Sequence, residues 1–173
     1  MKEDGHQVSI KDMMDCRDQR VEKQNAMLAV HHAPLVSFCL NIPGPVKTDP
    51  QIRAAFEIGK KSIEDALSEC SMEILDAFEK HEKTGDELML SIDADAEKLK
   101  TIMSRIEDTH PLGRLFDIDI IGTDGQKLSR ARFRTCLLCS RQAQECARTR
   151  RHPVQELFDK AEEMISSYLA DKK

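Results

Sequence analysis

The segment 110–121, with the sequence HPLGRLFDIDII, predicts a turn that leads into a buried strand. Because side chains alternate between the two faces of a strand, the apolar residues at 116, 118 and 120 would share one face. Asp117 and Asp119 would share the opposite face, with their Cα atoms about 6–7 Å apart. Aspartate is rare in strands, and two unpaired carboxylates beside an apolar face are unfavourable. We therefore expect a positive group to compensate this pair.

A bound Mg²⁺ suits these two carboxylates, since it takes hard oxygen ligands and also binds phosphate. Just before the strand, Gly113 permits a close approach of backbone or ligand, and Arg114 offers a planar group that binds phosphate. The alternative is an ordinary alternating strand with a solvated acidic face. The Gly-Arg pair before the strand and the Ile-Ile pair after it favour a functional site centred on Asp117 and Asp119.

Apolar spacing and capping residues predict the order of helices and strands. The predicted helices span about 9–30 with Ser9 as N-cap, 50–69 with Asp49 as N-cap, the segment from the N-cap Asp93 to just before His110, and a last segment that begins at Pro153. The predicted strands span about 35–42, 88–92, the acidic strand, and 127–129 after a hairpin turn at 123–126. Residues 72–78 are ambiguous, although a strand suits the topology better.

The middle six elements match the split β-α-β pattern of a ferredoxin-like sheet, and a nucleotidyltransferase-palm-like sheet would also suit. We predict an α+β fold with a four- to five-stranded, mostly antiparallel sheet, flanking helices and a C-terminal Cys-rich segment. The last helix would pack across the sheet. Residues 1–173 would form a single domain, with an N-terminal helix at 9–30, a core at 34–129, and an Arg/Cys-rich segment plus helix at 130–173.

Charge is unevenly distributed along this chain of 173 residues, whose net charge is −5. Residues 129–152 contain seven arginines and one glutamate, a net charge of +6 that leaves −11 for the remainder. General affinity for nucleic acid would need a basic molecule, whereas a basic segment on an acidic protein indicates a defined anionic partner. The N-terminal MKEDGHQ does not resemble a signal peptide, and no apolar run suits a bilayer. We therefore expect a cytoplasmic protein without a membrane partner.

The six cysteines should be reduced in that compartment, which makes them thiols, metal ligands or core residues. Cys136 and Cys139 form a C-x-x-C pair, and Cys146 and His152 follow closely. These four residues suit a structural Zn²⁺ site, although their spacing is not a standard zinc-finger spacing. The alternative is a set of reduced cysteines that pack a short helix.

The motifs HPLGRLFDID, PLVSF, PGPVK and CLLC…CAR together resemble the apo-citrate lyase phosphoribosyl-dephospho-CoA transferase family, also called citrate lyase holo-acyl-carrier-protein synthase. They occur in the family's order, from about Ser9 to the last helix. Phe116 stands where the family often carries Trp, and residues 73–87 contain no recognised motif. The resemblance implies a nucleotidyltransferase that moves phosphoribosyl-dephospho-CoA from 2'-(5''-triphosphoribosyl)-3'-dephospho-CoA to a serine of the citrate lyase acyl carrier (gamma) subunit and releases pyrophosphate.

The same resemblance implies roles for individual residues. Asp117 and Asp119 would hold Mg²⁺ against the triphosphate. Lys47, which precedes the predicted helix N-terminus at Pro50, would neutralise phosphate oxygens together with Arg114. His110 would either accept the serine proton or cap a turn. Further substrate contacts are implied at three arginines, namely Arg17, Arg20 and Arg130; the alternative for these is ordinary solvated charge.

Two other functions stay open at this point. One is a related nucleotidyltransferase that acts on a different carrier, such as the carrier of a malonate decarboxylase. The other is a non-enzymatic, zinc-stabilised adaptor whose arginine-rich segment binds RNA. The acidic remainder and the aromatic content of only 4% argue against the adaptor, because single-stranded RNA is bound largely by base stacking on aromatic side chains.

Overall fold

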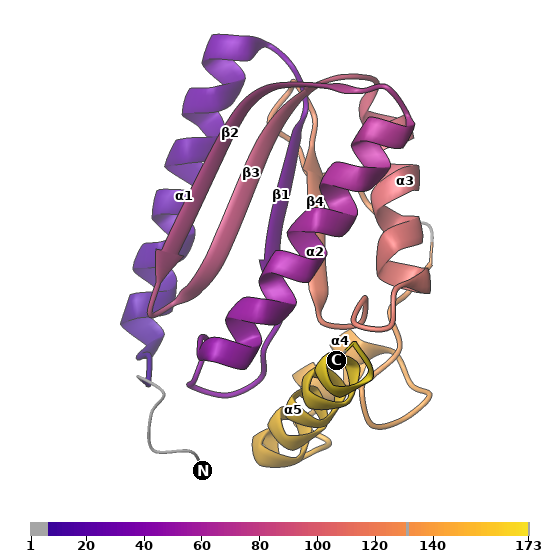
Figure 1. Ribbon diagram of the computed structural model, residues 1–173. Coiled ribbons are helices and arrows are strands. Elements are labelled where there is room, and N and C mark those ends of the chain that lie inside the picture. Colours follow the sequence, from indigo (N-terminus) through magenta and orange to yellow (C-terminus); the bar gives the residue numbers. More distant parts are fainter. Residues whose placement is uncertain (1–6, 131, 173) are drawn as a thin grey trace.

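The computed structural model describes residues 7–130 and 132–172. The elements follow in the order α1 (Ile10–His31), β1 (Leu35–Leu40), α2 (Pro50–Glu69), β2 (Glu73–Glu82), β3 (Gly85–Asp93), α3 (Ala96–Thr109), β4 (Phe116–Ile121), α4 (Ala143–Arg148) and α5 (Val154–Asp171). Figure 1 shows one sheet with helices packed on it, and α4 and α5 at one end. The α+β class is therefore confirmed. None of the described helices is long and apolar enough to span a membrane.

Side-chain caps set the starts of the first two helices. Ser9 and Asp12 form a capping box at α1, in which the Asp12 amide donates to Ser9 Oγ at 3.1 Å and the Ser9 amide donates to Asp12 Oδ2 at 2.8 Å. At α2, Asp49 accepts hydrogen bonds from the amides of Gln51 and Ile52. Pro50 occupies the first turn, where its missing N–H costs no hydrogen bond.

The strands lie in the order β2-β3-β1-β4, and every neighbouring pair is antiparallel. β1 and β2 therefore run in the same direction with β3 between them, which is the predicted split β-α-β arrangement. The ambiguous segment at 72–78 belongs mostly to β2, one edge of the sheet. β4 forms the other edge, so the acidic pair lies at an edge of the sheet (Figure 1).

The two faces of the sheet are covered by different helices. α2 and α3 pack on the face that contains Phe38 and Phe116, and Phe38 stacks on Phe56 of α2 with the ring centroids 5.1 Å apart. α1 packs on the opposite face, chiefly over β2 and β3. Asp117 and Asp119 point to this second face and remain partly exposed, because α1 does not cover their part of β4.

Two local predictions about the strands and caps were wrong. No fifth strand forms at 127–129 within the described ranges: Lys127 makes only an isolated bridge with Ile121. The chain then leaves the sheet, because Arg130 binds acidic residues of α3. At the start of α3, Asp95 rather than Asp93 is the N-cap, since β3 continues through Asp93 and the Lys98 amide donates to Asp95 at 2.9 Å.

The position of α5 also differs from the prediction. This helix packs against α2 at the end of the sheet and not across it (Figure 1). The reason is that α2 and α3 already occupy the face that an additional helix would need. Ala161 and Ile165 of α5 join the main core, and Tyr168 packs on His110 with the ring centroids 5.4 Å apart.

Candidate active site

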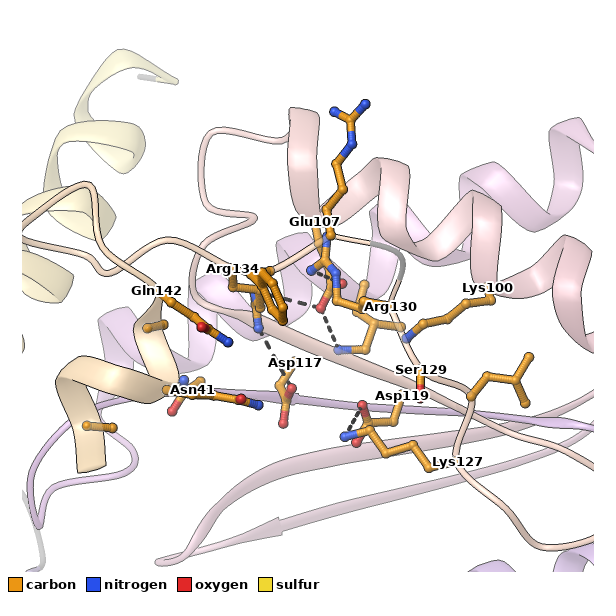
Figure 2. Close-up of a pocket in the computed structure, with 17 residues that line it drawn as sticks. Asn41, Lys100, Glu107, Asp117, Asp119, Lys127, Ser129, Arg130, Arg134 and Gln142 are labelled. Carbon is orange, nitrogen blue, oxygen red and sulfur yellow. Dashed lines mark hydrogen bonds and ion pairs between the residues drawn. The ribbon is translucent and has the colours of Figure 1, made fainter. Parts of the chain in front are cut away.

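A cavity of about 620 Å³ opens beside the acidic strand, between β4, α3 and the segment that follows residue 126. Figure 2 shows charged side chains from these elements around it. Its charged lining residues are the cations Lys100, Lys127, Arg130, Arg132 and Arg134 and the acids Glu107, Asp117 and Asp119. The cavity thus combines an excess of positive charge with a pair of carboxylates, which suits a phosphorylated ligand held together with a divalent cation.

The acidic pair lies on one face of β4, as the alternation of side chains predicts, and both carboxylates line the cavity. Lys127 Nζ lies 2.6 Å from Asp119 Oδ1, whereas Arg134 Nη1 lies 3.8 Å from Asp117 Oδ1 (Figure 2). Burial and the neighbouring charge of Asp119 raise the pKa of Asp117. Asp117 is therefore only partly compensated by protein cations, which leaves it suited to a metal ion.

Glu107 connects α3 to β4 and to the segment after it. Its Oε1 accepts a hydrogen bond from the Ile118 amide at 3.1 Å, and its Oε2 lies 2.7 Å from Arg130 Nη1. Arg130 also binds the more exposed Asp108 at 2.6 Å. Burial raises the pKa of Glu107, against the opposing effect of the arginines and the Ile118 amide. This network fixes Arg130, a predicted substrate contact, on the wall of the cavity.

Arg134 fixes the turn before β4 through backbone contacts. Its Nη2 donates to the carbonyl oxygens of Gly113 at 3.0 Å and Phe116 at 2.5 Å. The same guanidinium lies 3.7 Å from Glu107. Arg134 therefore holds the start of the acidic strand through Nη2, while Nη1 of the same guanidinium faces Asp117.

A smaller cavity of about 140 Å³ adjoins the first, and Asn41 and Asp117 line both. Three of the predicted substrate-binding residues, Arg17, Arg20 and Lys47, line this smaller cavity. The structure thus brings these cations, which are distant in sequence, into one cavity with Asp117. Asp117 lies at the junction of the two cavities.

The three cations of the smaller cavity differ in their existing partners. Arg20 binds the buried Glu87 with Nε at 2.7 Å, and Lys47 donates to the Ile42 carbonyl at 2.5 Å. Burial lowers the pKa of Lys47. Arg17 lines this cavity and makes no hydrogen bond or ion pair with any described residue.

Cys39, opposite Asp117 in the register of β1 and β4, also lines the smaller cavity. Burial raises the pKa of its thiol to about 12, against the opposing effect of Arg20. The thiol therefore stays protonated at neutral pH and is unsuited to act as a nucleophile.

The turn residues predicted for the site lie outside both cavities. His110 Nδ1 accepts a hydrogen bond from the Leu112 amide at 3.0 Å, which is a turn cap. A Cβ at Gly113 would lie 2.4 Å from the Glu107 carbonyl oxygen, so this glycine permits a close approach of backbone and not of a ligand. Arg114 is half-buried, and burial together with Arg134 lowers its pKa.

The cysteine-rich segment brings its four predicted metal ligands together. One ligand atom from each of Cys136, Cys139, Cys146 and His152 lies within 4.8 Å of all the others. All six cysteines of the chain are free thiols. The cluster therefore has the composition of a metal site, at a position distinct from the acidic pair.

Comparison with known proteins places this chain in a family. The family model described as apo-citrate lyase phosphoribosyl-dephospho-CoA transferase matches residues 8–168. The chain belongs to this family. A probable transferase of this name from Vibrio cholerae is 39% identical over 166 residues, covering 93% of each chain. The Escherichia coli transferase is 36% identical over 165 residues, covering 93% of this chain and 90% of the relative, and that of Citrobacter koseri is 36% identical over 164 residues.

Membership of this transferase family confirms two predictions, the resemblance itself and the conclusion that the protein is an enzyme. It also favours the enzyme over the RNA-binding adaptor. The acidic pair and its surrounding cations thus lie in a protein whose relatives are named for the transfer of a phosphate-containing group.

Several residues of the site were not identified from the sequence. Lys100, Glu107, Lys127, Arg134 and Asn41 all line the larger cavity. One signal was present: Lys100 and Glu107 are seven residues apart on α3, so they share a face with the buried Met103. Charged residues on an otherwise buried helix face indicate a polar site against the sheet.

Proposed function

We propose that this protein transfers phosphoribosyl-dephospho-CoA from triphosphoribosyl-dephospho-CoA to a serine of the citrate lyase acyl carrier subunit. The serine oxygen forms a bond to the phosphorus nearest the ribose, and the bond from that phosphorus to the oxygen shared with the second phosphate breaks. The electron pair leaves with pyrophosphate, and the serine proton is released to the solvent. The observation that carries this proposal is Asp117 at the junction of two cation-lined cavities, with Asp119 beside it in the larger one, in a member of this family.

The acidic pair fits a magnesium ion by the chemistry of its donors. Both groups are carboxylates, both line the larger cavity, and Asp117 has only the distant Arg134 as an ion-pair partner among the described residues. We assign Asp117 and Asp119 as the ligands that hold Mg²⁺. When bound, the ion would neutralise phosphate charge in the transition state.

The cations on both sides of Asp117 bind the phosphates in this proposal. Lys127 and Arg130 line the larger cavity, and Arg17 and Lys47 line the smaller one. Phosphoryl transfer depends mostly on positioning and charge neutralisation, which such side chains supply. We do not assign the serine proton to His110 or a phosphate contact to Arg114, because neither residue lines a cavity in which the reaction would occur.

The carrier subunit would dock on the arginine-rich segment beside the larger cavity. Arg148, Arg150 and Arg151 are exposed, and Ala147, the residue before them, lines the cavity. Phe133 is 81% exposed at the same cavity and offers an apolar contact. Acyl carrier proteins are usually acidic around the modified serine, so charge would steer the approach. We place this reaction in the cytoplasm, where the free thiols of the chain would stay reduced.

The direct test mixes the protein with Mg²⁺, triphosphoribosyl-dephospho-CoA and the apo-carrier of citrate lyase. Mass spectrometry should show the carrier gaining one phosphoribosyl-dephospho-CoA group on a serine, with release of one pyrophosphate. A malonate decarboxylase carrier serves as the comparison and should be modified much more slowly. An unmodified citrate lyase carrier would refute the proposed function, and faster modification of the other carrier would refute the choice of partner.

A further inference from the structure

Three thiols and one imidazole converge in the segment between β4 and α5. Cys139 Sγ lies 3.6 Å from Cys146 Sγ and 3.4 Å from His152 Nε2. Cys136 and Cys146 are buried, with 9% and 6% of their surface exposed. Cys136, Cys139, Cys146 and His152 have their ligand atoms within 4.8 Å of one another.

These separations agree with a tetrahedral zinc site. Zn–S bonds of about 2.3 Å and Zn–N bonds of about 2.0–2.1 Å place two sulfur ligands roughly 3.8 Å apart, and a sulfur and a nitrogen ligand roughly 3.6 Å apart. The observed separations of 3.6 Å and 3.4 Å lie close to both values. A disulfide would need the two sulfur atoms at about 2.05 Å.

The backbone around the first two cysteines also suits thiolate ligands. The Leu138 amide donates to Cys136 Sγ at 3.5 Å, a bond that favours the charged sulfur. The Cys136 amide donates to the Arg141 carbonyl at 2.7 Å, and Thr135 and Gln142 form an isolated bridge. The C-x-x-C pair is therefore carried on a closed loop, as a rigid ligand pair requires.

We propose that Cys136, Cys139, Cys146 and His152 bind one Zn²⁺ as a structural site. The three thiols release their protons when the metal binds, and His152 coordinates as neutral imidazole through Nε2. With four protein ligands the site has no open position, which distinguishes a structural site from a catalytic one. Soft thiolate ligands in a tetrahedral set favour zinc over the hard cation proposed at the acidic pair.

The zinc site would stabilise one wall of the larger cavity. Arg132, Phe133 and Arg134, which precede the cluster, line the cavity. Residues 142–144 and 147, which lie between Cys139 and His152, line it as well. α4 has only six residues, too few for a stable isolated helix. Cross-linking through the metal would hold this segment in place, independently of which carrier or substrate the enzyme uses.

The test measures metal on the full chain, purified under reducing conditions and without a histidine tag. Elemental analysis should give about one zinc per chain. Cys139→Ser and His152→Ala should each lose most of this zinc. Cys70→Ser changes an exposed thiol at the end of α2 and should keep it, which makes this variant the matched control.

A second measurement keeps the proposal testable if the ligand variants fold poorly. Chelation of the wild-type protein should speed amide hydrogen exchange in residues 132–152 and leave the strands unchanged, and added zinc should reverse this effect. A folded wild-type protein with negligible zinc would overturn the proposal. So would an intact mass showing a disulfide between Cys139 and Cys146 in the freshly isolated protein, or full zinc retention in Cys139→Ser.

Discussion

Asp117 has an unfavourable charge in the folded protein without metal. Burial and the nearby Asp119 raise its pKa, and the closest described cation, Arg134, is 3.8 Å away. A raised carboxyl pKa means that the folded protein favours the protonated form. The residue best suited to bind a cation is thus the residue that destabilises the fold without one.

Replacing Asp117 with Asn should therefore raise the melting temperature at neutral pH. The folded state prefers protonated Asp117, so stability is lost as pH rises from the unfolded Asp pKa of about 3.9 through the higher folded value. Below the unfolded value the variant and the wild type should melt alike. Thermal unfolding at a series of pH values, without Mg²⁺, measures this difference.

Asp18→Asn is the matched control, because Asp18 is exposed on α1 and makes no ion pair with a described residue. It should melt like the wild type at every pH. Addition of Mg²⁺ with pyrophosphate should raise the melting temperature of the wild type and of Asp18→Asn but not of Asp117→Asn, since only a ligand that binds the folded state stabilises it. An equal shift in all three proteins would contradict the metal assignment.

At the scale of elements, α3, β4 and the segment after β4 are joined through Glu107. It accepts the Ile118 amide of the strand, binds Arg130 of the following segment and itself belongs to α3. A buried carboxylate with these partners positions the acidic strand against the helix. This junction, and not a fifth strand, sets where Lys127 and Arg130 reach the cavity.

Glu107→Ala should destabilise the fold by about 3 kcal/mol, because it leaves the largely buried Arg130 without its buried partner. Asp108→Ala removes an exposed partner of the same arginine and should cost less than about 1 kcal/mol. Urea unfolding of both variants measures the two free energies. Equal losses would show that Glu107 does not hold this junction.

The elements were predictable where local chemistry determines them. Ser9 and Asp49 cap α1 and α2, and the alternation in 116–121 places the two aspartates on one face of β4. The absence of a strand at 127–129 was not predictable, because it depends on the ion pair between Arg130 and Glu107, which belongs to a helix distant in sequence. The sequence contains both residues but no local signal that they pair.

At the scale of the whole molecule, the site is assembled from segments far apart in the chain. Asp117 lies between Arg17 of α1 and Lys47 of the loop before α2 on one side and Arg130 on the other. The sequence motifs identified most of these residues individually. Their grouping around one carboxylate follows only from the strand order, which places β4 beside β1.

Charge on the arginine-rich segment should govern encounter with the carrier. The triple variant Arg148→Glu, Arg150→Glu and Arg151→Glu should slow carrier association about tenfold or more at low salt and weaken its dependence on salt. Binding of the small-molecule substrate should change less. Stopped-flow association at several salt concentrations measures both effects.

The matched control reverses three exposed cations elsewhere, in Lys61→Glu, Lys98→Glu and Arg105→Glu, and so changes the net charge equally. It should associate faster than the arginine variant at the same salt concentration. Equal association rates for the two triple variants would show that net charge, and not the arginine-rich segment, causes the slower association. Docking would then be assigned to the N-terminal helix around Arg17 and Arg20.

In the proposed reaction, transfer to the carrier serine depends on the two carboxylates of β4. The most direct measurement is the rate of carrier modification, followed by mass spectrometry, for Asp117→Asn and Asp119→Asn with Asp18→Asn as control. Each β4 variant should be at least about 100-fold slower than the wild type while keeping its circular dichroism spectrum and a melting temperature near or above wild type. Wild-type turnover in either folded β4 variant would contradict a role of these carboxylates in the transfer.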